Sequence, residues 1–303
     1  MRIRTIATAV SGALALSALA VPAVYAADGA NGIATSPRWA PVTADDGPSA
    51  FGAATATDGD LDVSFSAMKV NGGKPVVVGA SKDRSVPVTY TLTHAADLDI
   101  TDEDFANGPF LYLKSMPSSV LDEFDEPVQF GQKEATCTPT SPTTASCKAS
   151  IELYPGASLV NAQATTWKVG GLAFQGDPLT KDLKETWQGK LGTARLQRLA
   201  KLTGANASPE PVRKGKTLTV TSRLTRASWD TNKYPAYTGQ SVKLQFKKKG
   251  TSVYSDVKTV KSSSTGALKT TVRATVDGTY RFVFAGTSTT AAVTSAADAV
   301  DVK

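Results

Sequence analysis

The chain has 303 residues, a formal net charge of +6, two Cys and one His. So few thiols and imidazoles exclude zinc modules built from Cys and His, and a Ser-His-Asp triad would have to use the single histidine. The length is more than one β-sandwich usually takes and suits two domains of ordinary size.

The N-terminus predicts a cleavable export signal over residues 1–26. Arg2 and Arg4 precede a run of small and apolar residues, and Val24-Tyr25-Ala26 is typical of a cleavage site. The run is shorter than the ~20 apolar residues of a membrane helix. We therefore expect a secreted protein without a transmembrane segment, extracellular or loosely associated with the cell wall.

Residues 27–50 have the Gly, Pro and Asp content of a flexible, disordered leader. Short strands are then expected at spacings of roughly 8 to 15 residues, which is typical of a sandwich or barrel. Apolar and polar residues alternate with period 2 at 61–65 and 86–92. Further strands are expected at 110–113, 128–130, 151–153 and 167–174.

One helix is expected near the end of the first half. Asp177 is a candidate N-cap and Pro178 suits a first helical turn. Leu179, Leu183 and Trp187 fall at i, i+4 and i+8, which is helical spacing. This helix would close the first domain or link it to the second.

The second half shows a clearer alternation. Leu196 and Leu199 are expected on its first strand, and period-2 patterns follow at 218–224 and 242–247. Asp277-Gly278 predicts a hairpin turn, and a last strand is expected at 299–302. Six or seven strands in about 110 residues describe an immunoglobulin-like sandwich.

These patterns predict an all-β fold of two immunoglobulin-like β-sandwich domains that follow the signal peptide and the leader. The first domain is expected over 51–190 and is acidic. The second is expected over 191–303 and is basic.

Cys137 and Cys147 are expected to form a disulfide, because an exported chain with an even number of cysteines favours pairing. The segments on both sides have strand patterns and the residues between them are turn-like. The bond would then close the end of a hairpin in the acidic domain.

Several segments resemble secreted actinobacterial (Streptomyces-like) proteins of the immunoglobulin-like β-sandwich kind. The similar segments are RKGKTLTV at 213–220, 224–229, 237–242 and 280–286 in the second half, and 70–75 and 87–94 in the first half. That family carries no assigned function. The resemblance implies the fold and export and leaves the activity open.

The charge is divided unevenly between the two halves. Residues 50–190 hold 18 Asp+Glu against 11 Lys+Arg, whereas residues 191–303 hold 6 against 19. Opposite charges mean that the domains attract each other or serve different partners. The basic half is a candidate for binding polyanions, through Arg223, Lys243, Lys247, Lys248 and Lys249. The alternative is a solvated surface on which lysines protect sheet edges from aggregation.

A calcium site is the second candidate. Asp97, Asp99, Asp102 and Asp104 are closely spaced carboxylates of the kind that calcium prefers, although they do not match an EF-hand loop. Apart from this possible calcium, no cofactor is expected.

No catalytic residues are predicted. No nucleophile elbow, P-loop, dinucleotide fingerprint or zinc-protease motif is present, and His94 is expected at a strand end without a catalytic role. The leading hypothesis is a non-enzymatic binding or structural protein whose partner is an anionic cell-envelope polymer or an extracellular protein. Specific nucleic-acid binding is not expected. The alternatives are a calcium-dependent extracellular module and a carboxylate-dependent hydrolase.

Overall fold

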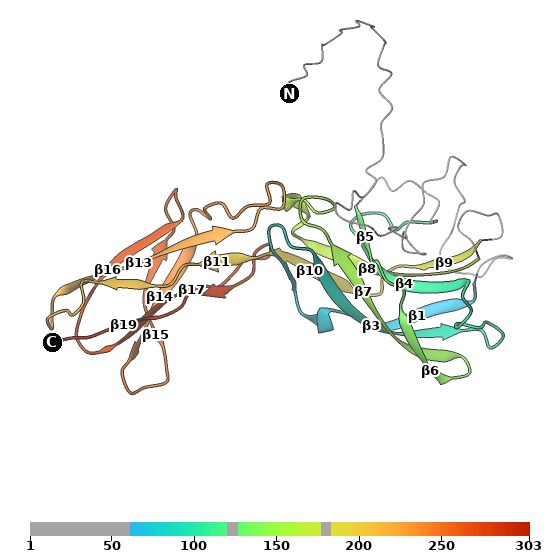
Figure 1. Ribbon diagram of the computed structural model, residues 1–303, viewed down its shortest axis with the longest axis horizontal. Coiled ribbons are helices and arrows are strands. Elements are labelled where there is room, and N and C mark those ends of the chain that lie inside the picture. Colours follow the sequence, from blue (N-terminus) through green and yellow to red (C-terminus); the bar gives the residue numbers. More distant parts are fainter. Residues whose placement is uncertain (1–60, 120–126, 177–182) are drawn as a thin grey trace, which may run out of the picture. The chain divides into compact units, whose positions relative to one another are not determined.

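Two sets of β-sheets make up the computed structural model, which describes residues 61–119, 127–176 and 183–303 (Figure 1). All of these residues belong to one compact unit, Ser36–Lys303. The expected signal peptide and leader lie outside the described residues, as do Asp177, Pro178 and Leu179 of the expected helix.

The first set of strands, which we call the N-terminal sandwich, contains a four-stranded and a six-stranded sheet. The four-stranded sheet has the order β1 (Val63–Val70), β3 (Arg84–His94), β7 (Thr144–Leu153) and β6 (Thr136–Ser141). The six-stranded sheet has the order β2 (Val76–Val78), β10 (Thr193–Arg198), β8 (Thr166–Gln175), β4 (Phe105–Tyr112) and β5 (Val128–Phe130), with β9 (Lys184–Gln188) also paired to β8. Short 3₁₀ turns lie at η1 (Asn71–Gly73) and η2 (Asn161–Gln163).

Alternate side chains of these strands fill a large hydrophobic core, and a second, smaller cluster on β4, β8 and β9 includes Phe110, Phe174 and Trp187. In β3, Val86, Val88, Tyr90 and Leu92 are buried, as the period-2 pattern predicts. They belong to the same core cluster as Trp167 and Val169 of β8, which come from the other sheet. The strand order of the two sheets is that of an immunoglobulin-like sandwich, with a split last strand formed by β9 and β10.

The helix prediction is wrong in the part that the structure describes. Lys184–Gln188 is strand β9, antiparallel to β8. Glu185 and Trp187 are both buried, so the buried positions of β9 follow period 2. They lie beside Phe174 and Leu172 of the smaller cluster, and the polar Glu185 hides the pattern in the sequence. The Trp187 indole N–H donates to the Glu185 carboxylate (3.2 Å), which makes a buried glutamate compatible with a strand.

The remaining strands form a second sandwich, which we call the C-terminal sandwich. One sheet contains β11 (Ala200–Leu202), β12 (Asn206–Ser208), β13 (Thr217–Arg226) and β16 (Ala267–Arg273), all paired to β13. The other has the order β15 (Ser255–Lys261), β14 (Ser241–Lys248), β17 (Gly278–Phe284) and β18 (Val293–Thr294), with β19 (Asp298–Val300) also paired to β17. Side chains of both sheets share one core cluster, which includes Leu218, Leu244 and Phe282.

The predicted hairpin at Asp277-Gly278 is wrong, because β16 pairs with β13 and β17 pairs with β14. The segment between β16 and β17 therefore connects the two sheets. Gly278 is needed for packing: a Cβ there would lie 2.3 Å from the Phe246 ring and 2.4 Å from the Lys247 carbonyl oxygen. Asp277 accepts a hydrogen bond from the Val302 N–H (2.9 Å), which ties the turn to the C-terminal segment.

The strand that contains Leu196 pairs with the first set of strands. β10 is parallel to β2 and antiparallel to β8, and Leu196 belongs to the first core cluster. Leu196 was expected on the first strand of the basic half, so this expectation is wrong for that residue. The pairing of the second set begins at Ala200 with β11.

Trp229, from the segment between β13 and β14, is fully buried in the first core cluster. Its indole N–H donates to the Val78 carbonyl (3.5 Å), and its main-chain N–H donates to the Asn161 side chain (2.9 Å). The first core is therefore completed by a residue that lies far along the sequence.

We expect Trp229→Ala to lower the free energy of unfolding by about 3–5 kcal/mol, because it removes a fully buried aromatic side chain. Urea unfolding followed by circular dichroism measures the change. Val253→Ala, at a residue that is 71% exposed, is the control and should leave the midpoint unchanged. A loss below about 1 kcal/mol for the tryptophan variant would show that this side chain does not support the core.

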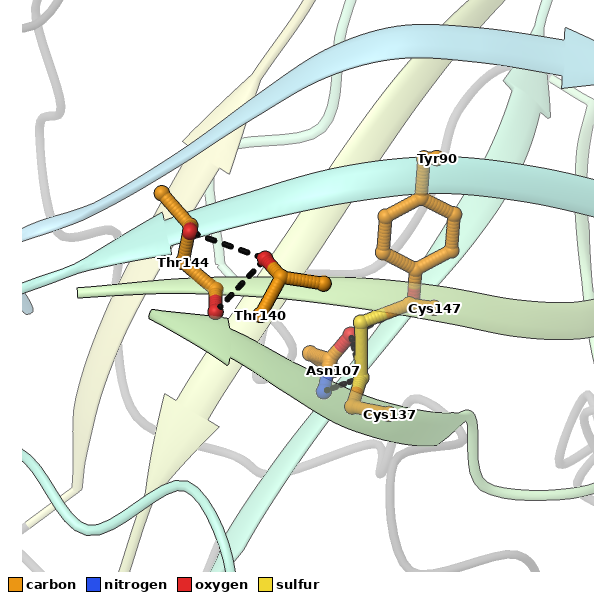
Figure 2. Close-up of a disulfide and its surroundings, with 6 residues drawn as sticks. All are labelled: Tyr90, Asn107, Cys137, Thr140, Thr144 and Cys147. Carbon is orange, nitrogen blue, oxygen red and sulfur yellow. Dashed lines mark hydrogen bonds between the residues drawn. A yellow bond between two sulfur atoms is a disulfide. The ribbon is translucent and has the colours of Figure 1, made fainter. Parts of the chain in front are cut away.

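The disulfide is confirmed: Cys137 of β6 and Cys147 of β7 lie directly opposite each other, with 4.1 Å between their Cα atoms (Figure 2). The Asn107 amide donates to the Cys137 sulfur (3.6 Å) and its oxygen accepts from the Tyr90 hydroxyl. Burial raises the pKa of Tyr90, so the phenol remains a neutral donor. The disulfide thus anchors the edge strand β6 to the core.

Replacing both Cys137 and Cys147 with Ser should lower the free energy of unfolding by roughly 2–3 kcal/mol, as the chain-entropy model gives for a short loop. Urea titration checks this. Wild-type protein in excess reductant should unfold at the same midpoint as the double variant. Equal midpoints for oxidised wild type and double variant would contradict the prediction.

Candidate polyanion-binding face

The five predicted polyanion-binding residues lie on two different sheets. Lys243 and Lys247 occupy β14, Lys248 ends that strand and Lys249 follows it, whereas Arg223 lies on β13. Their neighbours Leu224, Val242 and Leu244 are fully buried in one shared core. Because side chains alternate along a strand, Arg223 and Lys243 point outward from opposite faces of the C-terminal sandwich. The structure therefore does not bring the five together.

On the β14 side, two of the lysines form ion pairs with carboxylates. The Lys243 ammonium lies 2.6 Å from the Asp256 carboxylate, and the Gln245 amide donates to the same carboxylate (2.8 Å). These hydrogen bonds, that of Lys243 first, lower the pKa of Asp256. Lys249 forms a similar pair with Asp277 (3.2 Å).

An aromatic ring engages further cations on the same side. The Arg281 guanidinium lies 3.7 Å from the Tyr254 ring centroid, and the Lys247 ammonium lies 5.3 Å from it. The Arg281 Nε–H also donates to Gln245 (2.9 Å). The β14 face is thus a connected polar network in which most positive groups already have a partner.

The opposite face presents uncompensated positive charge. Its sheet is formed by β11, β12, β13 and β16, and the exposed basic residues at its outward positions are Lys201, Arg223, Lys269 and Arg273. Threonines occupy most other outward positions of β13 and β16, namely Thr217, Thr219, Thr221, Thr225 and Thr271. No Asp or Glu occurs in these four strands. We call this surface the threonine-basic face.

Strand pairing sets the spacing of the cations on this face. Arg223 lies opposite Ala267, so Lys269 is its diagonal neighbour, with about 7–8 Å between the two Cα atoms. Two cations at this distance in water repel each other by only about 0.5 kcal/mol, so the sandwich tolerates them without a counter-charge. Lys201 lies opposite Thr225, and its ammonium is 3.6 Å from the Tyr234 ring centroid.

The carboxylates of residues 199–303 lie elsewhere. Asp230 accepts hydrogen bonds from Asn161, and Asp298 accepts one from the Ala207 N–H (2.7 Å). Partial desolvation and the nearby charge of Asp298 raise the pKa of Glu210. Asp256, Asp277 and Asp301 pair with Lys243, Lys249 and Lys303, so among the described residues no carboxylate forms an ion pair with the four cations of the threonine-basic face.

The sequence did not predict Lys201, Lys269 or Arg273, because only the pairing of β13 with β11 and β16 places them on the same face as Arg223. The available signal was the alternation of Thr with basic residues along both strands. The run Lys247-Lys248-Lys249 was more conspicuous in the sequence, but it lies at the end of β14.

The predicted calcium ligands are occupied by local turns. Asp99 accepts hydrogen bonds from the Thr101 N–H (2.8 Å) and hydroxyl (2.6 Å), which lower the pKa of its carboxyl group. Asp102 accepts from the Asp104 N–H (3.0 Å). In residues 61–119, 127–176 and 183–303, no three Asp, Glu, His or Cys side chains converge at metal-binding spacing, and this includes Asp97. The calcium hypothesis stays a prediction without geometric support.

His94 is the last residue of β3, as expected, but it is buried, with 8% of its surface exposed. Its Nδ1 lies 2.9 Å from the Ala95 carbonyl, and Nε2 is buried without a hydrogen-bond partner among the described residues. The imidazole is therefore packed at the end of β3. The expectation of a non-enzymatic protein stays a prediction.

Asp256→Asn should reduce the acid sensitivity of the protein. A carboxyl with a lowered folded-state pKa stabilises the fold above its unfolded pKa of about 3.9, and this contribution is lost as the pH falls through the folded value. The variant should therefore show a lower Tm at pH 7 and a smaller drop in Tm between pH 5 and pH 2 than wild type. Equal drops in Tm for the variant and wild type would show that the ion pair with Lys243 adds no stability.

Comparison with known proteins gives no family. No family model and no curated protein matches the chain. Among solved structures, the D00-D0 domain of intimin is 11% identical over 77% of this chain and 98% of its own, with a TM-score of 0.25. A marsupial T cell receptor is 12% identical over 79% and 73%, with a TM-score of 0.26. At such scores these likenesses carry no argument, and the immunoglobulin-like assignment rests on the strand pairing.

None of the helices in the part of the chain that the structure describes has the length and apolar character needed to cross a membrane.

Proposed function

We propose that this is a non-enzymatic extracellular binding protein whose C-terminal sandwich holds an anionic polymer on the threonine-basic face. The observation that carries the proposal is the collection of Lys201, Arg223, Lys269 and Arg273 on strands without a carboxylate. Cations on flat strands, separated by hydroxyl donors, suit a linear chain of phosphates or carboxylates. An anionic polymer of a cell envelope has this chemistry.

The choice of face follows from the partners of the lysines. On the β14 side a polymer would have to displace Asp256 and Asp277 from their ion pairs. On the threonine-basic face it would provide a counter-charge for cations that form no ion pair with any carboxylate in the described part of the chain. The proposal therefore assigns the main contact to Arg223 and Lys269 and a lesser contribution to Lys247 and Lys248.

Retention of the protein on linear polyphosphate beads, measured across a salt series, tests the proposal. The double change Arg223→Glu and Lys269→Glu should remove most of the retention and reduce the salt-dependence slope by roughly 1.5–2, because counterion release scales with the number of contacts. Cosedimentation with cell walls should likewise be weaker for the double variant than for wild type, and weaker after the anionic polymers are removed from the walls.

Two double variants serve as controls. Lys74→Glu with Lys82→Glu makes the same change in net charge on exposed residues of the N-terminal sandwich and should weaken retention only slightly. Lys247→Glu with Lys248→Glu tests the other side of the C-terminal sandwich. Equal losses in all three double variants would mean that net charge alone retains the protein, and the proposal would be wrong.

A further inference from the structure

One edge strand, β16, lacks the interruptions that protect the other edges. β2, β5, β11, β12, β18 and β19 contain three residues or fewer. β1, β6 and β15 contain register shifts. The side chains of Thr186 and Gln188 in β9 bond to the main chain of Leu61 and Phe65. β16 alone among these edges has seven residues in unbroken register with its neighbour β13 and no proline.

Edge strands of natural sheets are kept short, bulged or charged, because an open edge pairs with other chains. β15 is protected in two ways, by its register shift and by Lys258, which lies opposite the core residue Leu244. The only such device on β16 is its charge, from Lys269 and Arg273. Positive charge repels a basic strand and attracts an acidic one.

The free side of β16 faces a groove. The groove has a volume of about 460 Å³ and lies between β16 and β15, which belong to different sheets. Its apolar lining consists of Phe246, Val257, Val272 and Tyr280, and its basic lining consists of Lys258 and Arg273. Among the residues that the structure describes, no carboxylate lines it.

Exposed apolar side chains gather at this groove. Val257, which lines it, is 45% exposed, and Val276, next to the lining residue Thr275, is 38% exposed. Val260 of β15 and Val272 of β16 are only partly buried although both pack against the core. An apolar side chain placed in the groove would cover Val257 and Val272, which line it.

Main-chain groups of β16 are directed toward the groove. The Ala274 N–H donates to the Lys216 carbonyl on the β13 side. Bonding alternates along an antiparallel pair, so the N–H and C=O groups of Lys269, Thr271 and Arg273 point away from β13. Thr271 and Arg273 are also lining residues of the groove.

We infer that β16 and this groove bind an extended segment of a partner protein in which apolar residues alternate with Asp or Glu. The segment adds as a strand beside β16 and bonds to the main chain of Lys269, Thr271 and Arg273. Alternate side chains of the bound segment then point to opposite faces of the sheet. Apolar ones enter the groove against Val257 and Val272, and acidic ones lie on the outer face beside Lys269 and Arg273.

The probe is a fluorescent peptide of alternating Val and Glu, as long as β16 and blocked at both ends, titrated into the full chain and followed by anisotropy. A peptide with the same side chains, N-methylated on the N–H groups that would bond to β16, should bind about tenfold more weakly, because it lacks those donors. A peptide with Lys in place of Glu should not bind.

Protein variants separate the groove from the charge. Val257→Ser should weaken peptide binding about fivefold through the lost apolar contact. Val253→Ser, at an exposed valine outside the lining, should bind like wild type. Val257→Ser should leave retention on polyphosphate unchanged, so this inference and the proposed function can fail separately.

Three results would overturn the inference. The first is equal binding of the N-methylated and unmethylated peptides, which would reduce the interaction to charge. The second is no effect of Val257→Ser on peptide affinity. The third is a concentration-dependent dimer, seen by sedimentation velocity, that the peptide does not dissociate, which would assign the edge to a second copy of this chain.

Discussion

Burial of every second side chain along β13 determines what the C-terminal sandwich presents to solvent. Leu218, Val220 and Leu224 are fully buried against the opposite sheet. A shift of one residue in register would move them to the surface, so the register is strongly fixed. The intervening threonines and Arg223 must then point outward. The threonine-basic face is thus a consequence of core packing, whatever it binds.

The same constraint explains why abundant lysine is a poor guide to a binding surface. Lys243 and Lys249 lie beside Asp256 and Asp277, which face them across neighbouring strands and turns. Such exposed pairs add little stability, but they do cancel charge locally. Lys269 and Arg273 lie on β16, and neither β16 nor its neighbour β13 contains an Asp or Glu. The distribution of carboxylates, more than that of cations, separates the two faces.

Local alternation could be predicted from the sequence, whereas pairing between distant strands could not. The alternation at 86–92 corresponds to β3, whose inward residues are apolar throughout. The strand expected at 167–174 is β8, in which residues 169–174 are all buried. β9 was missed because one of its two buried positions is Glu185, whose carboxylate accepts a hydrogen bond from Trp187. Leu183 and Trp187 fit both helical and strand spacing, and only the pairing with β8 decides between them.

Asp277-Gly278 shows a second limit of local reasoning. The dipeptide is a strong hairpin signal when its flanking strands pair with each other. Here Gly278 is required because the Phe246 ring and the Lys247 carbonyl leave no room for a Cβ, and Asp277 bonds to Val302 instead of supporting a hairpin. Prediction of the candidate site met the same limit. Arg223 was predicted, but Lys201 and Lys269 become its neighbours only through pairing between strands that are distant in sequence.

The threonine-basic face and the groove at β16 share a strand, but the ligands that we propose for them differ. The face offers side-chain donors and charge, so it discriminates weakly between polyanions of similar spacing. The groove adds main-chain bonds in a fixed direction and an apolar pocket of limited size, which together select an extended polypeptide. Because Arg273 contributes to both surfaces, a polymer on the face would compete with an acidic peptide for that charge. Two ligands that bind the same cation lower each other's affinity, so a polymer bound to the face would weaken binding of acidic segments in the groove.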